Sequence, residues 1–383
     1  MTSKAGPLRI CFVAHSAYGE MAGGRSGDKG GIQRQQSLMA RWLVARGHDV
    51  RMITWDEGQG ADEVVIDGVR VFRVCREDDG LPGLRFFHPR WTSLLGAFRR
   101  ADAEVYYHNA AEYVTGQVAL WTRRAERKFV FSTAHDTDCD ARFNRTRSLR
   151  ERLLYRHGLT NADRVISQTR VQQQMLRDQF GLDSVVIPMP CPPARAGARA
   201  RHPGAGPARV LWAGRIASGK RLEMLLDVAE AAPELHFDVA GGPTRPTPYS
   251  DEVLARAARI PNVTLHGRVE RERMPALYEG AAFLCCTSTI EGFPNTFLEA
   301  WSVGLPVVST FDPDHLIAER GLGATAPDAP GLLREMRALL ASPAAWQKAS
   351  EESLRYFNEN HLPEVTMGSF ERVFLEASGR GEV

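Results

Sequence analysis

The stretch "FLCCTSTIEGFPNTFLEAWSVG" (residues 283–304) combines the two elements from which most of this chain is built. Its beginning, "FLCCTS" (283–288), is a short apolar run of the kind that forms a buried strand. The part after the turn, "NTFLEAWSVG" (295–304), has the pattern of a helix that stops at Gly304. A buried strand followed closely by a helix is the repeating unit of a parallel α/β sheet.

The same alternation runs through nearly the whole chain. Strands are predicted at residues 8–15, 49–55, 104–109, 128–135, 164–169, 185–190, 209–214, 235–241, 263–267, 283–288 and 306–310. Asp67-Gly68, within "VVIDGVRVFRV" (64–74), predicts a β-hairpin. Apolar strands separated by amphipathic helices indicate parallel sheets that are covered by helices on both faces.

The composition changes at "CPPARAGARARHPGAGPA" (191–208), which is rich in Pro, Gly and Ala and has no apolar period. We interpret this segment as a linker between an N-terminal domain (1–190) and a C-terminal domain (209–362). Residues 363–383 form a C-terminal helical segment that could pack back on the N-terminal domain. The predicted fold class is therefore α/β, with two doubly wound domains and a site facing the cleft between them.

The composition excludes several classes of protein. A length of 383 residues suits two domains, and a formal net charge of +2 gives no support to nucleic-acid binding. The six cysteines have no zinc-like spacing and indicate buried thiols in a reducing cytosol. No secretory signal is visible, and no apolar run approaches the roughly 18 residues of a membrane span. We therefore expect a cytoplasmic protein that meets a membrane, if at all, peripherally at its inner face.

Two glutamates, Glu291 and Glu299, lie on either side of the Gly-Phe-Pro-Asn turn. Pro294 suits the first helical turn, where the missing N–H costs nothing. The backbone N–H groups that such a helix start offers to an anion belong to Phe293, Asn295 and Thr296. Carboxylates accept hydrogen bonds from sugar hydroxyls, so the pair predicts a phosphate flanked by two polyols, as in a nucleotide sugar. The alternative is a solvated Glu299 and a capping Glu291.

The loop "VLWAGRIASGKR" (210–221) offers Arg215 and Lys220 at the carboxyl end of a strand. Charge-assisted hydrogen bonds contribute roughly 1.5–3 kcal/mol each. A helix dipole adds only about 0.3–1 kcal/mol, so the two cations matter more for a diphosphate. Gly214 to Lys220 also spells G-x-x-x-x-G-K, the phosphate loop of nucleoside triphosphatases. Arg221, however, stands where that loop has a Ser or Thr for Mg²⁺.

The first domain offers two further candidates. Gly30 and Gly31 end a glycine-dense loop (19–35) and would let the backbone approach a ligand closely. His135 ends a predicted strand (128–135) and could contact a reacting group. The aspartates after it, in "HDTDCD" (135–140), have the D-x-D spacing of a metal site. Because Arg215 and Lys220 already provide cations for the phosphates, no metal is required. We therefore favour a solvated loop over a metal site.

Two stretches are rich in arginine, and the first of them also contains several aromatic residues. The first is "GLRFFHPRWTSLLGAFRR" (83–100). The second contains Arg142, Arg145, Arg147, Arg150, Arg152 and Arg156, with Glu151 the only acid among them. Either stretch could bind an anionic membrane or a phosphorylated acceptor. A partly buried helix and a solvated face explain them equally well.

Together these motifs resemble the retaining GT-B glycosyltransferases of family 4, over nearly the whole chain. The most specific element is the E-x7-E pair in "EGFPNTFLEA" (291–300), and "KGGIQRQQSLMARWLVARGHDV" (29–50) supports it. The resemblance implies two Rossmann-like domains and a UDP- or GDP-sugar donor. It implies transfer of a hexose-type sugar to a hydroxyl of a glycan, glycolipid or small molecule, with retention and with neither a metal nor another cofactor.

The resemblance also implies roles for individual residues of the second domain. Glu299 would hold the ribose hydroxyls, and Glu291 would hold the donor sugar. Arg215 and Lys220 would neutralise the diphosphate and stabilise the charge of the leaving group. Arg268, in "LHGRVE" (265–270), would lie near the base.

In the first domain, the family's cleft histidine corresponds to His135 and its close-approach glycine to Gly31. Pro294 and Asn295 depart from the family, which often has a second glycine or a small residue there; this departure removes one backbone donor. Two other functions remain open at this point: a P-loop-like nucleotide hydrolase, and a non-catalytic nucleotide-sugar-binding protein.

Overall fold

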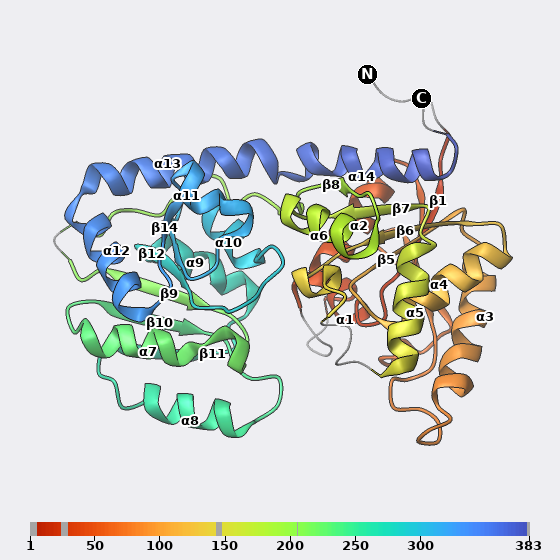
Figure 1. The fold of residues 1–383 in the computed structure, drawn as a ribbon, viewed down its shortest axis with the longest axis horizontal. Coiled ribbons are helices and arrows are strands. Elements are labelled where there is room, and N and C mark those ends of the chain that lie inside the picture. Colours follow the sequence, from red (N-terminus) through yellow and green to blue (C-terminus); the bar gives the residue numbers. More distant parts are fainter. Residues whose placement is uncertain (1–5, 24–29, 143–147, 205, 381–383) are drawn as a thin grey trace. The chain divides into compact units, whose positions relative to one another are not determined.

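The computed structural model describes residues 6–23, 30–142, 148–204 and 206–380. The chain divides into two compact units, each built around its own mostly parallel sheet (Figure 1). Unit 1 comprises residues 1–190 and 363–383, and unit 2 comprises residues 191–362. Residues 191–208, which we interpreted as a linker, lie in unit 2, where Cys191, Ala198 and Ala200 are buried.

The sheet of unit 1 has, in the described residues, the strand order β3-β4-β2-β1-β5-β6-β7-β8. Its strands are β1 (Arg9–Val13), β2 (Asp49–Thr54), β3 (Glu63–Ile66), β4 (Val69–Arg73), β5 (Val105–Asn109), β6 (Lys128–Ser132), β7 (Arg164–Ser167) and β8 (Val185–Val186). All neighbours pair in parallel except β3 and β4, which form the predicted hairpin. Asp67 and Gly68 both have positive φ there, the conformation that the Asp-Gly signal indicates.

The helices of unit 1 are α1 (Tyr18–Met21), α2 (Gly31–Ala45), α3 (Thr92–Ala101), α4 (Tyr113–Arg124), α5 (Leu149–Thr160), α6 (Arg170–Phe180) and α14 (Pro363–Ala377). Helices α4 and α5 approach until their backbones touch. A Cβ atom at Gly116 would overlap the carbonyl group of Leu154, and one at Gly158 would overlap that of Thr115. Glycine at these two positions therefore fixes where α5 lies on unit 1.

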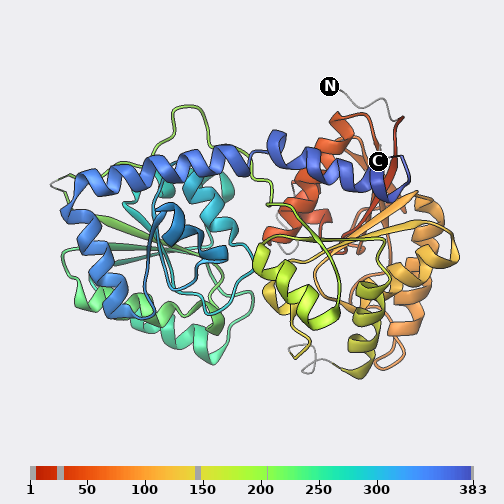
Figure 2. The same ribbon diagram turned by 45° about the horizontal axis from the view of Figure 1, so that its top comes forward.

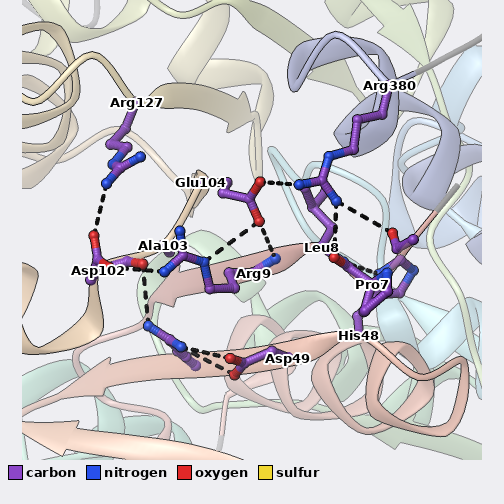
Figure 3. Close-up of polar contacts among 12 residues, drawn as sticks. Pro7, Leu8, Arg9, His48, Asp49, Asp102, Ala103, Glu104, Arg127 and Arg380 are labelled. Carbon is purple, nitrogen blue, oxygen red and sulfur yellow. Dashed lines mark hydrogen bonds and ion pairs between the residues drawn. The ribbon is translucent and has the colours of Figure 1, made fainter.

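Helix α14 belongs to unit 1 although it is the last helix of the chain (Figures 1 and 2). Its Phe374 is fully buried, with its ring centroid 5.7 Å from that of Tyr107 on β5. Just beyond the helix, Arg380 pairs with Glu104 and donates to the carbonyl oxygen of Pro7 at 2.9 Å (Figure 3). Glu104 in turn accepts the backbone N–H of Arg9 at 3.0 Å, so the end of the chain is tied to the start of β1.

The sheet of unit 2 is parallel throughout its described strands, in the order β11-β10-β9-β12-β13-β14. The strands are β9 (Arg209–Ala213), β10 (His236–Ala240), β11 (Val263–Gly267), β12 (Phe283–Cys286), β13 (Val307–Ser309) and β14 (Gly323–Thr325). The helices are α7 (Leu222–Ala231), α8 (Pro248–Ala257), α9 (Met274–Gly280), α10 (Asn295–Ser302), α11 (Leu316–Arg320), α12 (Ala329–Ala341) and α13 (Pro343–Asn360). We did not predict β14, because three residues without a buried apolar run give no strand signal.

The strand order of each unit reverses at one point. In unit 2 the chain moves outward from β9 to β10 and β11, and then returns to add β12 on the other side of β9. In unit 1 the same reversal places β1 between β2 and β5. Ligands of doubly wound sheets bind at the carboxyl ends of the strands where the order reverses. We therefore expect ligand-binding residues in the loops after β9 and β12 in unit 2, and after β1 and β5 in unit 1.

The contact between α4 and α5 can be tested with glycine substitutions. Gly158→Ala should destabilise the protein by about 1–3 kcal/mol, because its new methyl group overlaps the backbone of α4. Gly368→Ala in α14 is the matched control: a Cβ atom there meets nothing within 4 Å, and alanine should stabilise the helix by roughly 0.5–1 kcal/mol. Thermal unfolding should show a lower Tm for the first variant. An unchanged Tm for Gly158→Ala would contradict the contact.

Candidate functional site

The two loops that carry the predicted donor motifs meet in unit 2. They follow β9 and β12, which are neighbours in the sheet, with Val210 paired to Phe283. The backbone N–H of Thr289 donates to the carbonyl oxygen of Gly219 at 2.9 Å, and the Thr287 hydroxyl donates to that of Lys220 at 2.7 Å. The motifs are separated by about seventy residues of sequence, but parallel pairing places both loops at the same edge of the sheet.

Lys220 and Glu291 form an ion pair within this group of loops. The Glu291 side chain is only 8% exposed, whereas that of Lys220 is 30% exposed. A carboxylate this deeply buried needs a compensating charge, and the Lys220 ammonium provides it. We predicted separate ligand roles for these residues, and the structure places them against each other. A ligand that takes Lys220 must therefore also provide new hydrogen-bond donors for Glu291.

The Glu291 charge also affects a neighbouring thiol. Burial raises the pKa of Cys286, and the nearby Glu291 carboxylate raises this pKa further. Burial likewise raises the pKa of Cys285. Both cysteines remain protonated at neutral pH, so they act as small apolar residues beneath the site and not as nucleophiles.

Arg215 is the exposed cation of the same loop. Its guanidinium forms no hydrogen bond or ion pair with any residue that the structure describes. Arg215 lies in the loop between β9 and the 3-10 turn Ser218–Lys220, which leads into α7. Arg215 is therefore a cation that is available to an external anion.

The start of α10 presents backbone donors close to Glu291. Pro294 precedes the helix in an extended conformation, and does not occupy the first turn as we expected. The side chain of its N-cap residue, Pro294, makes no capping hydrogen bond, and the first residues of the helix are Asn295 and Thr296. The Phe293 ring is buried, 5.2 Å from the ring of His361. Phe293 can therefore contact a ligand only through its backbone.

Glu299 lies one turn further along α10 and is held in place by a residue that sequence reasoning missed. The hydroxyl of Tyr278 on α9 donates to Glu299 Oε2 at 2.6 Å. Tyr278 is almost fully buried, whereas Glu299 is partly exposed. The carboxylate thus has a fixed orientation. No motif links residues that are 21 positions apart on different helices, so the sequence offers no signal for this contact.

Arg268 follows β11, on the other side of β9 from the Glu291 loop. Its guanidinium is exposed and donates to the carbonyl oxygen of Pro243, which follows β10, at 2.8 Å. The backbone N–H of Gly241 also donates to the carbonyl oxygen of Gly267 at 2.7 Å. The loops after β10 and β11 are thus joined, and they form a second part of the same sheet edge.

The phosphate-loop alternative fails at Arg221. This residue has a positive φ between the 3-10 turn Ser218–Lys220 and helix α7. Its guanidinium donates to the carbonyl oxygen of Thr287 at 2.7 Å and to the hydroxyl of Thr310 at 2.9 Å. Arg221 therefore holds the two loops together, at the position where a triphosphatase needs a hydroxyl for Mg²⁺.

In unit 1, the predicted glycines lie at the point where the strand order reverses. Gly30 immediately precedes α2, which begins at Gly31; residues 24–29 of the preceding loop lie outside the described residues. One turn further, the Gln36 amide donates to Asn109 at the end of β5. The start of α2 is thus held at the carboxyl end of β5, where a close approach of backbone to ligand would be useful.

His135 follows β6 and its side chain is exposed. The aspartates after it are engaged in the structure. Buried Asp138 accepts the backbone N–H groups of Ala134 and His135 at 2.8 and 3.1 Å, and Asp136 accepts the Gln172 amide at 3.0 Å. Among the described residues, no group of three His, Cys, Asp or Glu side chains could hold a metal ion. The D-x-D spacing therefore reflects a structural turn.

Two other histidines of unit 1 are unsuited to acid–base chemistry at neutral pH. His108 Nδ1 donates to the carbonyl oxygen of Val13 at 2.8 Å, and burial lowers the pKa of His108 to about 4. Burial lowers the pKa of His15 to about 3, helped by His108 and by the charge of Arg90. Both imidazoles are neutral, so His135 remains the candidate at this edge of the sheet.

A cavity of about 850 Å³ lies elsewhere in unit 2, at the amino ends of β9 and β10. Arg209, His236 and Asn262 are among the residues that line it, and none of the predicted site residues does. It lies at the edge of the sheet opposite the loops described above, and doubly wound sheets do not bind their ligands there.

Solved structures share this fold over nearly the whole chain. Sucrose-phosphate synthase from Thermosynechococcus elongatus is 18% identical, with a TM-score of 0.78, covering 97% of this chain and 98% of that one. Anabaena HepE in complex with UDP-glucose is 14% identical, with a TM-score of 0.74 and coverage of 96% and 100%. A lipopolysaccharide outer core galactosyltransferase, WaaB, is 13% identical, with a TM-score of 0.67 and coverage of 96% and 99%. These are GT-B glycosyltransferase structures.

Family models give the remaining comparison. A sequence search of curated proteins gives no match. Residues 30–191 match the glycosyl transferase 4-like domain, and residues 207–342 match the glycosyl transferases group 1. The first match lies in unit 1 up to residue 190, and the second lies within unit 2. The chain therefore belongs to the glycosyltransferases of GT-B fold that combine a glycosyl transferase 4-like domain with a group 1 domain.

Proposed function

We propose that this transferase moves a hexose-type sugar from a UDP- or GDP-sugar to a hydroxyl group of a glycan, glycolipid or small molecule, with retention of configuration and without a metal. The observation that carries the proposal is the meeting of Lys220, Glu291 and the start of α10 at one edge of the unit 2 sheet. Cations, backbone donors and carboxylates that lie this close together match the parts of a nucleotide sugar.

The diphosphate would be bound by the two cations of the β9 loop. Arg215 is available to it directly, and Lys220 would turn from Glu291 to a phosphate oxygen. Negative charge accumulates on the diphosphate as the bond to the sugar breaks, so cations held at this place stabilise the transition state more than the bound donor. This arrangement provides electrostatic catalysis from side chains alone.

The Lys220–Glu291 pair would couple recognition of the phosphate to recognition of the sugar. When Lys220 moves to the phosphate, Glu291 is left as a buried carboxylate, which is costly unless new donors replace the ammonium. The hydroxyl groups of the donor sugar are such donors. A complete nucleotide sugar compensates both charges, whereas a free nucleotide diphosphate compensates only Lys220. The site would therefore favour the intact donor.

Glu299 would accept hydrogen bonds from the ribose hydroxyls, in the orientation that Tyr278 imposes. Arg268 lies across β9 and would face the base. In unit 1, His135 would contact the reacting groups, and the backbone at Gly30 and Gly31 would pass close to the sugar. The complex of HepE with UDP-glucose supports the proposal of a uridine nucleotide and a hexose.

We also propose a cytoplasmic location, with peripheral contact at the inner face of a membrane. Among the described residues, no helix has both the length and the apolar character that crossing a bilayer requires. A peripheral contact would bring the enzyme to a glycolipid acceptor without a spanning segment.

Lys220→Ala and Glu299→Gln should each weaken donor binding or turnover by tenfold or more, on the order of 1.4 kcal/mol. The first variant removes a diphosphate cation, and the second removes a charged acceptor for the ribose. Calorimetric titration with UDP and GDP in the presence of EDTA measures affinity and metal independence together. Lys348→Ala, an exposed lysine of α13, is the control. Unaltered affinity and turnover in both variants would disprove the proposed donor site.

Tyr278→Phe tests whether Tyr278 positions Glu299. Loss of one hydrogen bond to a carboxylate should weaken UDP binding by roughly threefold to tenfold and leave kcat nearly unchanged. Binding of 2′,3′-dideoxy-UDP should be the same in wild type and variant, because that nucleotide lacks the hydroxyls that Glu299 would accept. An equal loss for both nucleotides would mean that the substitution damages the fold and not the ribose contact.

His135→Ala should lower kcat by roughly a hundredfold or more, while UDP affinity stays close to that of the wild type. The reason is that His135 would contact the reacting groups, whereas the nucleotide is bound by unit 2. His88→Ala, another exposed histidine of unit 1, serves as the control. Normal turnover by His135→Ala would remove this histidine from the catalytic residues.

A further inference from the structure

Large apolar side chains are exposed in two neighbouring segments of unit 1. Leu81, Leu84 and Phe87 lie in the segment before α3, and each is at least 61% exposed. Leu149 and Leu153 lie in the first turns of α5 and are 65% and 60% exposed. A soluble surface rarely gathers so many large apolar groups unless it contacts something. We call the surface formed by these five residues together with Arg85, Arg90, Arg150, Arg152 and Arg156 the apolar–basic face.

The two segments are joined by contacts at Phe86. The Arg150 guanidinium of α5 lies over the Phe86 ring, 4.0 Å from its centroid, and the Phe87 ring packs edge-on against Phe86 at 5.1 Å. The loop before α3 and the first turn of α5 lie next to each other at the same end of unit 1 in both views (Figures 1 and 2). The five apolar residues therefore form one surface.

The outer side of α5 has the pattern of a helix at a membrane interface. Leu149, Arg152, Leu153 and Arg156 follow one another at the i, i+3, i+4 and i+7 spacing of a single helix side. The opposite side of the helix packs on α4 through Gly158. Because this packing is fixed, the leucines and arginines are directed away from the core. Arginines can extend along apolar surface and place their charge in the headgroup layer.

The start of α5 is the basic part of the apolar–basic face: residues 148–156 contain Arg150, Arg152 and Arg156 and one acid, Glu151. The segment 81–91 before α3 contains Arg85 and Arg90 and neither Asp nor Glu. The one acid of α5, Glu151, accepts hydrogen bonds from the backbone and hydroxyl of Ser148 at 3.0 and 2.8 Å, at the start of the helix. The exposed acidic residues 77–79 lie beside the segment before α3: Arg90 donates to the carbonyl oxygen of Glu77 at 2.6 Å, and a Cβ atom at Gly80 would meet Pro89 and Arg85. Arg145 and Arg147 lie outside the described residues.

We infer that the apolar–basic face binds the surface of a bilayer that contains anionic phospholipids. The leucines and Phe87 would enter the boundary between headgroups and acyl chains, and the arginines would pair with lipid phosphates. A protein partner would instead need an acidic residue opposite each arginine and a separate pocket for each exposed apolar side chain. This inference rests on the peripheral membrane contact proposed above but not on sugar transfer, so vesicle binding and donor binding can each fail without the other.

Vesicle co-sedimentation tests the inference. Wild-type protein should sediment with vesicles of phosphatidylcholine mixed with phosphatidylglycerol and remain in solution with phosphatidylcholine alone. The double variant Leu149→Ser/Leu153→Ser and the double variant Arg152→Glu/Arg156→Glu should each bind the mixed vesicles roughly tenfold more weakly or worse. Added salt should weaken binding by the wild type, because the arginine contribution is screened.

Matched controls come from the same unit. Val65→Ser removes an exposed apolar residue from the edge strand β3, and Arg124→Glu reverses a charge on α4; neither should change vesicle binding. An unaltered Tm and UDP affinity in every variant would show that the fold and the donor site are intact. Failure of the wild type to bind phosphatidylglycerol vesicles, or equal binding by the face and control variants, would overturn the inference. So would a dimer in solution that the leucine substitutions abolish.

Discussion

The parallel pairing of β9 with β12 is the constraint on which the candidate site depends. Parallel strands bring their carboxyl ends to one edge, and the reversal of strand order leaves room there for a ligand. Two loops far apart in sequence therefore meet, and their main chains bond to each other through Gly219 and Thr289. Arg221 strengthens this junction because its guanidinium binds both Thr287 and Thr310. The chemistry proposed for the site needs this fixed junction.

The burial of Glu291 is the second constraint. A carboxylate in this position cannot remain without a partner, and Lys220 provides one in the structure. This pair stabilises the buried carboxylate, and the same two groups are the ones that we propose for binding the donor. Tyr278 acts differently on Glu299: it occupies one carboxylate oxygen permanently and so fixes the direction of the other. One carboxylate is thus paired with a cation, and the other is oriented by a hydroxyl group.

In unit 1, a close backbone contact between two helices positions the exposed leucines, whereas in unit 2 an ion pair positions the candidate site residues. Gly116 and Gly158 let α4 and α5 touch, which sets the direction in which Leu149 and Leu153 project. At the carboxyl edge of the same sheet, Asp138 holds a tight turn and leaves the imidazole of His135 exposed. The start of α5 lies at this same edge, because the Tyr155 hydroxyl donates to the carbonyl oxygen of Asp138 at 2.7 Å. A membrane contact through α5 would therefore lie beside the candidate catalytic histidine.

The sequence by itself determined the α/β class and the hairpin at Asp67-Gly68, because burial periodicity and turn chemistry are local properties. It also predicted the donor motifs, which stay a prediction. The short strand β14 gave no such local pattern. Only the tertiary structure decided that Lys220 pairs with Glu291, that Tyr278 holds Glu299, and that the Phe293 ring lies in the core. Those contacts join different elements, and their geometry follows from strand order and helix packing, which no spacing within one segment can specify.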